Sequence, residues 1–172
     1  MPKAGTFVNI IVGVSDMKIS NTPGTVLVTY SLGSCIAVAI YDPIVRVGGM
    51  LHFMLPDSEL DPEKAQNNPF MFADTGIPGL FKATYRLGAK KNRMQVVVVG
   101  GAQVCNGSDF FNIGKRNGIA VRKIFWKNNV MVNYQSVGGT DNRTLRLDVD
   151  DGRTWLRESG SGTSRYRIIN GR

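Results

Sequence analysis

Short apolar runs, separated by turn-forming residues, dominate the chain. Residues 36–41 (IAVAIY) favour a β-strand throughout and are followed by Asp42-Pro43, a typical turn pair. The run over residues 47–55 ends similarly at Pro56, so we expect these two segments to pair as a hairpin. The same pattern predicts strands over residues 7–14, 25–29, 36–41, 47–55, 94–101, 130–139, 143–150 and 153–158.

Two segments carry the three- and four-residue spacing of an amphipathic helix. The first spans residues 74–87, with Asp74 or Thr75 expected to cap its start and Gly88 expected to end it. The second predicted helix ends at Asn128-Asn129 and carries the apolar residues Ile113, Ala120, Val121, Ile124 and Phe125. The polar stretches 16–23 and 57–69 are expected to be loops.

The two predicted helices lie between strands without alternating regularly with them. This order favours an α+β fold, a layered α/β sandwich with a mixed, mostly antiparallel sheet, over a doubly wound sheet. No linker divides the first part of the chain, so we expect residues 1–158 to form a single domain. Residues 159–172 begin with a Gly/Ser stretch and carry arginines without acids, which predicts a flexible basic tail.

Composition narrows the function classes. The chain has 172 residues with 21 basic and 13 acidic side chains, a net charge of +8, which favours acidic partners. No nucleic-acid motif is present, so we expect no nucleic-acid partner. No apolar run approaches the ~18 residues that cross a bilayer, and no signal peptide is recognisable. We therefore expect a cytoplasmic protein without membrane insertion.

Metal and cofactor chemistry is not indicated. The two cysteines, Cys35 and Cys105, are far apart, and no CxxC or His/Cys cluster is present. The Gly-Gly pairs match neither a phosphate-binding loop nor a dinucleotide fingerprint. We expect no metal and no cofactor, and we interpret Cys105 as structural or incidental.

Cys35 and the single histidine, His52, are the candidate chemical groups. In one interpretation, Cys35 is a small core residue and His52 is structural. In the other, the imidazole lowers the pKa of the thiol, and Thr29, on the strand that enters the same turn, orients the imidazole. Gly33 and Ser34 leave room for a substrate carbonyl beside backbone N–H groups, which predicts an oxyanion hole.

The stretch "LGSCIAVAIYDP", followed by "GGMLHFMLP", resembles one family, the chemoreceptor glutamine deamidases (CheD) of bacterial chemotaxis. These two stretches carry the strongest likeness. Further matching pieces are "ADTGIPGLFKATYRLGAKKNRMQVVVVGGA", "IGKRN" and "VGGTDNRTLRLDVDDGR". The resemblance implies a catalytic Cys35, His52 and Thr29, and an active-site architecture similar to that of the deamidating cytotoxic necrotizing factor toxins.

The resemblance also implies a substrate and a partner. The expected reaction converts glutamine side chains of methyl-accepting chemoreceptors to glutamate through a thioester, and the expected partner is a CheC-type phosphatase. Two alternatives stay open: a regulatory module that docks on receptors or CheC with catalysis secondary, and an unrelated cysteine hydrolase of small amides. Arg116 or Asn117, in "IGKRN", is a candidate for supporting the site.

Overall fold

The computed structural model describes residues 7–103, 112–160 and 165–171, in which the chain forms two five-stranded sheets and three α-helices. Sheet A has the strand order β1 (Val8–Ile11), β3 (Thr25–Leu32), β8 (Arg143–Asp148), β9 (Thr154–Glu158) and β10 (Arg167–Asn170). Sheet B has the order β2 (Asp16–Ser20), β5 (Val47–Phe53), β4 (Ile36–Asp42), β6 (Gln95–Gly100) and β7 (Tyr134–Val137).

The expected α+β class is confirmed, but the expected single sheet is wrong because the strands divide into two sheets. Each sheet contains one parallel pair, β1 with β3 and β6 with β7, and its other pairs are antiparallel. The predicted hairpin of β4 and β5 is present, and β8 and β9 form the hairpin expected at Asp150-Asp151-Gly152.

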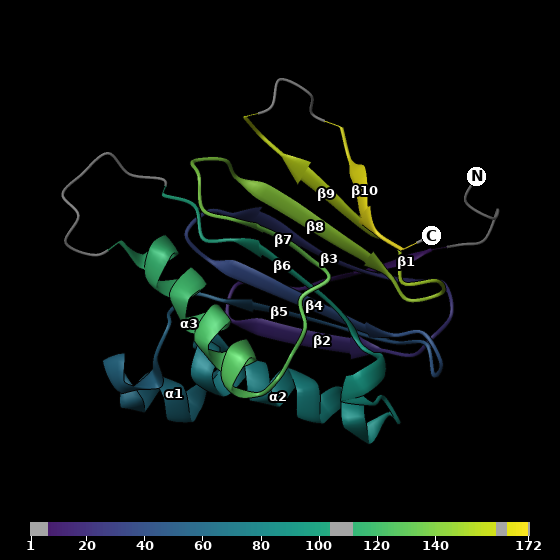
Figure 1. Ribbon diagram of the computed structural model, residues 1–172, viewed down its shortest axis with the longest axis horizontal. Helices are drawn as coiled ribbons and strands as arrows, with labels where there is room; N and C mark the ends of the chain where they lie inside the picture. Colours follow the sequence, from purple (N-terminus) through teal and green to yellow (C-terminus); the bar gives the residue numbers. More distant parts are fainter. Residues whose placement is uncertain (1–6, 104–111, 161–164, 172) are drawn as a thin grey trace.

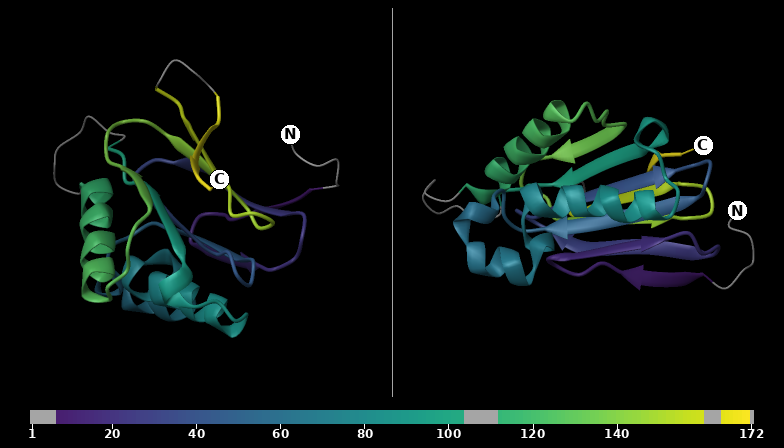
Figure 2. Two further views of the ribbon diagram at one scale, coloured as in Figure 1. Left: turned by 45° about the vertical axis from the view of Figure 1, so that its right-hand side comes forward. Right: turned by 90° about the horizontal axis from the view of Figure 1, so that it is seen from below.

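The molecule has three layers, sheet A, sheet B and the helices, with helices α2 (Ala73–Arg86) and α3 (Ile113–Lys127) covering the outer face of sheet B (Figures 1 and 2). Strand β4 lies at the centre and is buried along its whole length. Its alternate residues Ala37, Ala39 and Tyr41 pack between the two sheets. Ile36, Val38 and Ile40 pack toward the helices instead, as the period of two in a strand requires.

The helical elements differ in part from expectation. The polar stretch 57–69, expected to be a loop, includes the 3-10 turn Ser58–Leu60 and helix α1 (Pro62–Asn67), and a second 3-10 turn, Pro69–Met71, follows directly. Helix α2 begins after Phe72 without a side-chain cap, so the expected capping role of Asp74 or Thr75 is wrong. Asp74 instead accepts hydrogen bonds from Ser58, and Thr75 donates to the carbonyl of Pro69. A third 3-10 turn covers Lys91–Arg93.

Two segments expected to lack regular structure contain strands. Strand β2 occupies part of the stretch 16–23, where Met17 and Ile19 alternate with polar residues and pack against the helix-side core. Strand β10 occupies residues 167–170 of the expected flexible tail and pairs with β9. Both are edge strands. Their apolar pattern is weak, and pairing with the neighbouring strand stabilises them.

Candidate active site

Thr29 and His52 meet across the core from opposite sheets. Thr29 lies on β3 of sheet A, His52 lies on β5 of sheet B, and their side chains are 0% and 1% exposed. Thr29 Oγ1 lies 2.8 Å from His52 Nδ1 and 2.7 Å from the carbonyl oxygen of Val12. The predicted pair is therefore in direct contact, through a hydrogen bond that joins the two sheets.

The hydrogen bonds of Thr29 determine which imidazole nitrogen carries the proton. A carbonyl oxygen can only accept, so the Thr29 hydroxyl donates its proton to Val12 O. Thr29 Oγ1 is then the acceptor toward His52, and Nδ1 carries the hydrogen of the neutral ring. The other nitrogen, Nε2, is buried and has no hydrogen-bond partner within the described parts of the chain. It therefore presents a free lone pair, as a general base requires.

Cys35 immediately precedes strand β4, which pairs with the strand that carries His52. In the β4–β5 register, Ile36 pairs with Phe53 and Ala37 pairs with His52, so Cys35 immediately precedes this pairing. The Cys35 side chain is partly buried and packs against the core between the two sheets, the same side of sheet B on which His52 meets Thr29. The structure thus gathers Thr29, Cys35 and His52 at one end of the space between the sheets.

The Gly33-Ser34-Cys35 segment carries the chain from sheet A to sheet B. Its three carbonyl groups all accept hydrogen bonds from the surrounding protein: Gly33 O from Ala102 N at 2.8 Å, Cys35 O from Gly101 N at 2.8 Å and Ser34 O from the Asn117 side chain at 2.9 Å. The carbonyl and N–H of a trans peptide point in opposite directions. The N–H groups of Ser34 and Cys35 therefore point away from the donors that hold Gly33 O and Ser34 O.

Asn117 is the residue of the IGKRN stretch that reaches this segment. It is 0% exposed, and its side-chain nitrogen donates to Ser34 O at 2.9 Å and to Met54 O at 2.8 Å. Ser34 precedes β4 and Met54 follows β5. The Asn117 amide therefore holds together the start of one strand and the end of its neighbour. Arg116 is exposed, and neither of these hydrogen bonds comes from it. The feature of the sequence that indicates a role for Asn117 is its position as a polar residue on the buried face of an amphipathic helix.

Burial stabilises the neutral forms of the Cys35 and His52 side chains. It raises the pKa of the Cys35 thiol, against a lowering by the hydrogen bond from its own backbone N–H. Burial also lowers the pKa of His52 to about 4. At neutral pH the pair is therefore a thiol and a neutral imidazole, and the expected lowering of the thiol pKa in the resting protein is wrong.

We also searched the described residues for groups of metal ligands and for membrane-spanning helices. Within residues 7–103, 112–160 and 165–171, no three His, Cys, Asp or Glu side chains are grouped in a way that could hold a metal ion. No helix in the same ranges has the length and apolarity needed to cross a membrane. Cys105 lies outside the described residues.

Comparisons with known proteins point in one direction. A family model described as CheD chemotactic sensory transduction matches residues 54–158. "Probable chemoreceptor glutamine deamidase CheD 1" of Syntrophus aciditrophicus is 56% identical over 152 residues, which cover 88% of this chain and 95% of that protein. "Probable chemoreceptor glutamine deamidase CheD" of Solibacter usitatus is 50% identical over 151 residues, covering 88% and 89%. The protein of that name from Syntrophotalea carbinolica is 44% identical, covering 84% and 90%.

Among solved structures, the chain is similar to that of a hypothetical protein, YfiH, of Bacillus licheniformis. The TM-score is 0.47 at 12% identity, and the match covers 70% of this chain and 50% of that one. A likeness of this size says nothing about chemistry.

Proposed function

Because this chain belongs to the CheD family, we propose that it is a chemoreceptor glutamine deamidase. Its substrates are glutamine side chains of chemoreceptors, and the products are glutamate and ammonia. The observation that carries the chemistry is the buried contact of Thr29 with His52 Nδ1, since it leaves Nε2 free to accept a proton beside Cys35. Two relatives at 50% and 56% identity carry the name of this activity.

Cys35 is the nucleophile and His52 is the base that activates it. As Sγ attacks the amide carbon, the thiol proton passes to His52 Nε2, because the neutral thiol is the resting form. The amide oxygen takes up the displaced electron pair and becomes an oxyanion. The backbone N–H groups of Ser34 and Cys35 bind this oxyanion, and Gly33 leaves the space that the substrate occupies.

The imidazolium then completes the first half of the reaction. It donates its Nε2 proton to the amide nitrogen, ammonia leaves, and a thioester joins Cys35 to the substrate. Thr29 accepts the Nδ1 hydrogen throughout and so keeps Nε2 as the nitrogen that exchanges protons. Water next gives a proton to Nε2 and attacks the thioester, which releases glutamate and returns the thiol. No metal or cofactor is needed for these steps.

The wider setting follows from the family. We propose that residues 1–158, completed by strand β10 at the edge of sheet A, act as one deamidase domain in the cytoplasm, where receptor signalling segments lie, and that a CheC-type phosphatase is a partner. We also propose that the active-site architecture is similar to that of the cytotoxic necrotizing factor toxins. The net charge of +8 supports acidic partner surfaces.

The test uses a chemoreceptor cytoplasmic fragment from the same organism. Wild-type protein should release ammonia and raise the mass of a glutamine-containing receptor peptide by about one dalton, the change from amide to acid. Cys35→Ala should do neither, and Cys105→Ala is the matched control that should retain activity. Binding of the fragment without any mass change in the wild type would instead favour a regulatory module without catalysis.

A further inference from the structure

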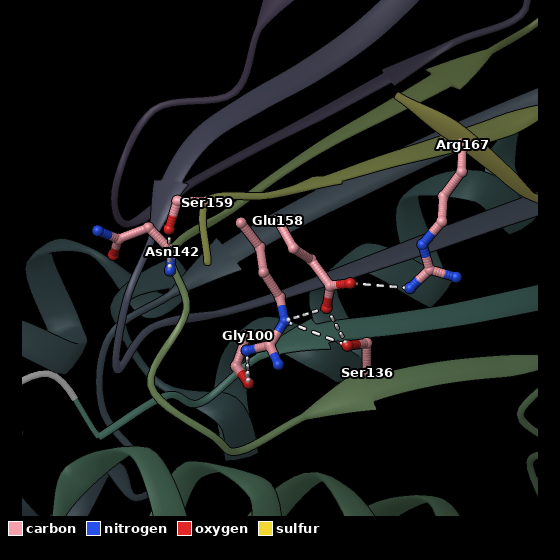
Figure 3. A network of polar contacts seen from close by, with 7 residues as sticks. Gly100, Ser136, Asn142, Glu158, Ser159 and Arg167 are labelled. Carbon is pink, nitrogen blue, oxygen red and sulfur yellow. Dashed lines mark hydrogen bonds and ion pairs between the residues drawn. The ribbon is translucent and has the colours of Figure 1, made fainter. Parts of the chain in front are cut away.

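A cluster of charged and polar side chains around the buried Arg143 joins sheet A to strand β7 of sheet B (Figure 3). Arg143 begins β8 and is only 6% exposed. Its Nε donates to Glu158 Oε1 at 3.1 Å and to Ser136 Oγ at 3.1 Å. Ser136 also donates to Glu158 Oε1, at 2.7 Å, and Arg167 of β10 donates to Glu158 Oε2 at 2.8 Å. Strands β7, β8, β9 and β10 thus share one network.

Glu158 is firmly ionised in this network. Figure 3 shows its carboxylate between Ser136 and Arg167. Burial by itself raises the pKa of Glu158, but the hydrogen bonds from Arg167, Ser136 and Arg143 lower it to about 2. The carboxylate therefore stays charged at neutral pH and holds the guanidinium of Arg143 in one orientation.

The other end of Arg143 reaches the backbone that supports Cys35. Arg143 Nη1 donates to the carbonyl oxygen of Gly100 at 3.2 Å, which also accepts from Gly138 N at 3.0 Å. The N–H of the same peptide unit belongs to Gly101 and donates to Cys35 O at 2.8 Å. Because the two ends of a trans peptide are rigidly opposed, holding Gly100 O also fixes the direction of the Gly101 N–H.

The approach of this peptide to Cys35 is unusually close. Gly100 has a φ of +119°, and a side-chain carbon placed on it would lie 2.2 Å from Cys35 O. The contact is therefore made by backbone against backbone, with no side chain between. A cationic donor on Gly100 O also polarises the peptide and strengthens donation by its N–H, as in any chain of hydrogen bonds.

We propose that Arg143 is a positioning residue for the nucleophile, acting through the Gly100-Gly101 peptide on the backbone of Cys35. The proposal rests on the proposed role of Cys35 in deamidation. Glu158 and Ser136 orient the guanidinium, and Arg167 of β10 holds Glu158. In this way the C-terminal strand contributes to the placement of a thiol that it does not touch.

The first experiment compares Arg143→Lys with Arg146→Lys in receptor deamidation. Lysine keeps the charge but lacks the planar fork that spans Glu158 and Gly100 O. Arg146 lies on the same strand but bonds Asn9 and stacks on Tyr166, away from Gly100. We expect Arg143→Lys to lower kcat about tenfold or more with KM within about twofold, and Arg146→Lys to leave both near the wild-type values.

Chemical rescue separates positioning from a general loss of structure. Arg143 and Glu158 line a cavity of about 300 Å³, together with Ser31, Asn142, Thr144, Arg157 and Ser159. Removing the side chain in Arg143→Ala enlarges this space enough for free guanidinium. Millimolar guanidinium chloride should raise kcat of Arg143→Ala several-fold, whereas sodium chloride at the same ionic strength should not.

Three results would overturn the inference. They are a kcat for Arg143→Lys within twofold of wild type, a rise in KM with unchanged kcat, and no rescue of Arg143→Ala by guanidinium. Absence of ammonia release by the wild type would instead refute the proposed function. In that event, the alkylation rate of Cys35 by iodoacetamide, followed by peptide mass spectrometry, still tests the inference, which requires a slower rate in Arg143→Lys than in Arg146→Lys.

Discussion

Replacing Thr29 with valine removes one hydroxyl from the centre of the site and keeps the shape of the side chain. In the wild type that hydroxyl accepts the Nδ1 hydrogen of His52 at 2.8 Å, inside a core where both residues are at most 1% exposed. In Thr29→Val the Nδ1–H loses its acceptor, so no hydrogen bond favours the tautomer that can accept the proton of Cys35. The imidazolium that forms when Nε2 takes up this proton also lacks an acceptor for its Nδ1–H.

The size of the effect follows from the cost of a buried donor without a partner, about 1–3 kcal/mol. At 1.36 kcal/mol for each tenfold change, this cost in the state that contains the imidazolium corresponds to a reaction roughly 5- to 150-fold slower. We expect kcat/KM for receptor deamidation to fall by about that factor in Thr29→Val, measured as ammonia release under subsaturating receptor fragment.

The matched control is Thr84→Val. Thr84 is also 0% exposed, and its hydroxyl donates to Phe81 O at 2.8 Å within helix α2, far from the chemistry. Its kcat/KM should stay within about twofold of the wild type, and thermal unfolding of both variants shows how much stability each loses. The reasoning is refuted if Thr29→Val retains more than half of wild-type kcat/KM, or if Thr84→Val loses as much as Thr29→Val.

Three further predictions address the surroundings of the thiol. Asn117→Ala leaves Ser34 O and Met54 O without their donor, so kcat should fall about tenfold with KM little changed, and unchanged kcat would exclude this support. Gly100→Ala forces a side-chain carbon against Cys35 O and should abolish measurable turnover. The control is Gly13→Ala, whose added carbon has nothing within 4 Å and should leave turnover unchanged. An active Gly100→Ala would contradict the close packing of Gly100 against Cys35. The pKa of His52 is lowered to about 4 from 6.5, so the unfolded chain takes up this proton first as the pH falls. Chemical denaturation should show the wild type losing about 2 kcal/mol more than His52→Gln between pH 7 and pH 5, and equal losses would exclude a buried neutral imidazole.

The local part of the site was predictable from the sequence, because the β4–β5 hairpin is encoded by two adjacent strands and their turn. That hairpin pairs His52 with Ala37, two residues after Cys35. The contact between His52 and Thr29 was harder to predict, since strand patterns do not reveal which of two sheets a strand joins. The structure explains the Gly33-Ser34 pair as the crossing between sheets, where a small, turn-forming segment lets the chain leave β3 and enter β4.

The supporting residues were harder to predict because their burial depends on segments far apart in the chain. Arg143 follows a glycine-containing loop and resembles a surface arginine until β7, β9 and β10 enclose it. Strand β10 itself has only four residues, three of them exposed or polar, and depends on pairing with β9 and on Arg167. Such elements carry little periodic signal, so pairing partners decide their structure.

Trapping the acyl-enzyme tests the central claim most directly. Wild-type protein is mixed with a glutamine-containing receptor peptide, quenched in acid within the first turnovers, digested and examined by mass spectrometry. The account predicts that the fragment containing Cys35 carries the peptide mass less ammonia, and that hydroxylamine removes it, as it does a thioester. Ammonia release by the wild type together with an adduct on another residue, or undiminished ammonia release by Cys35→Ala, would contradict the account.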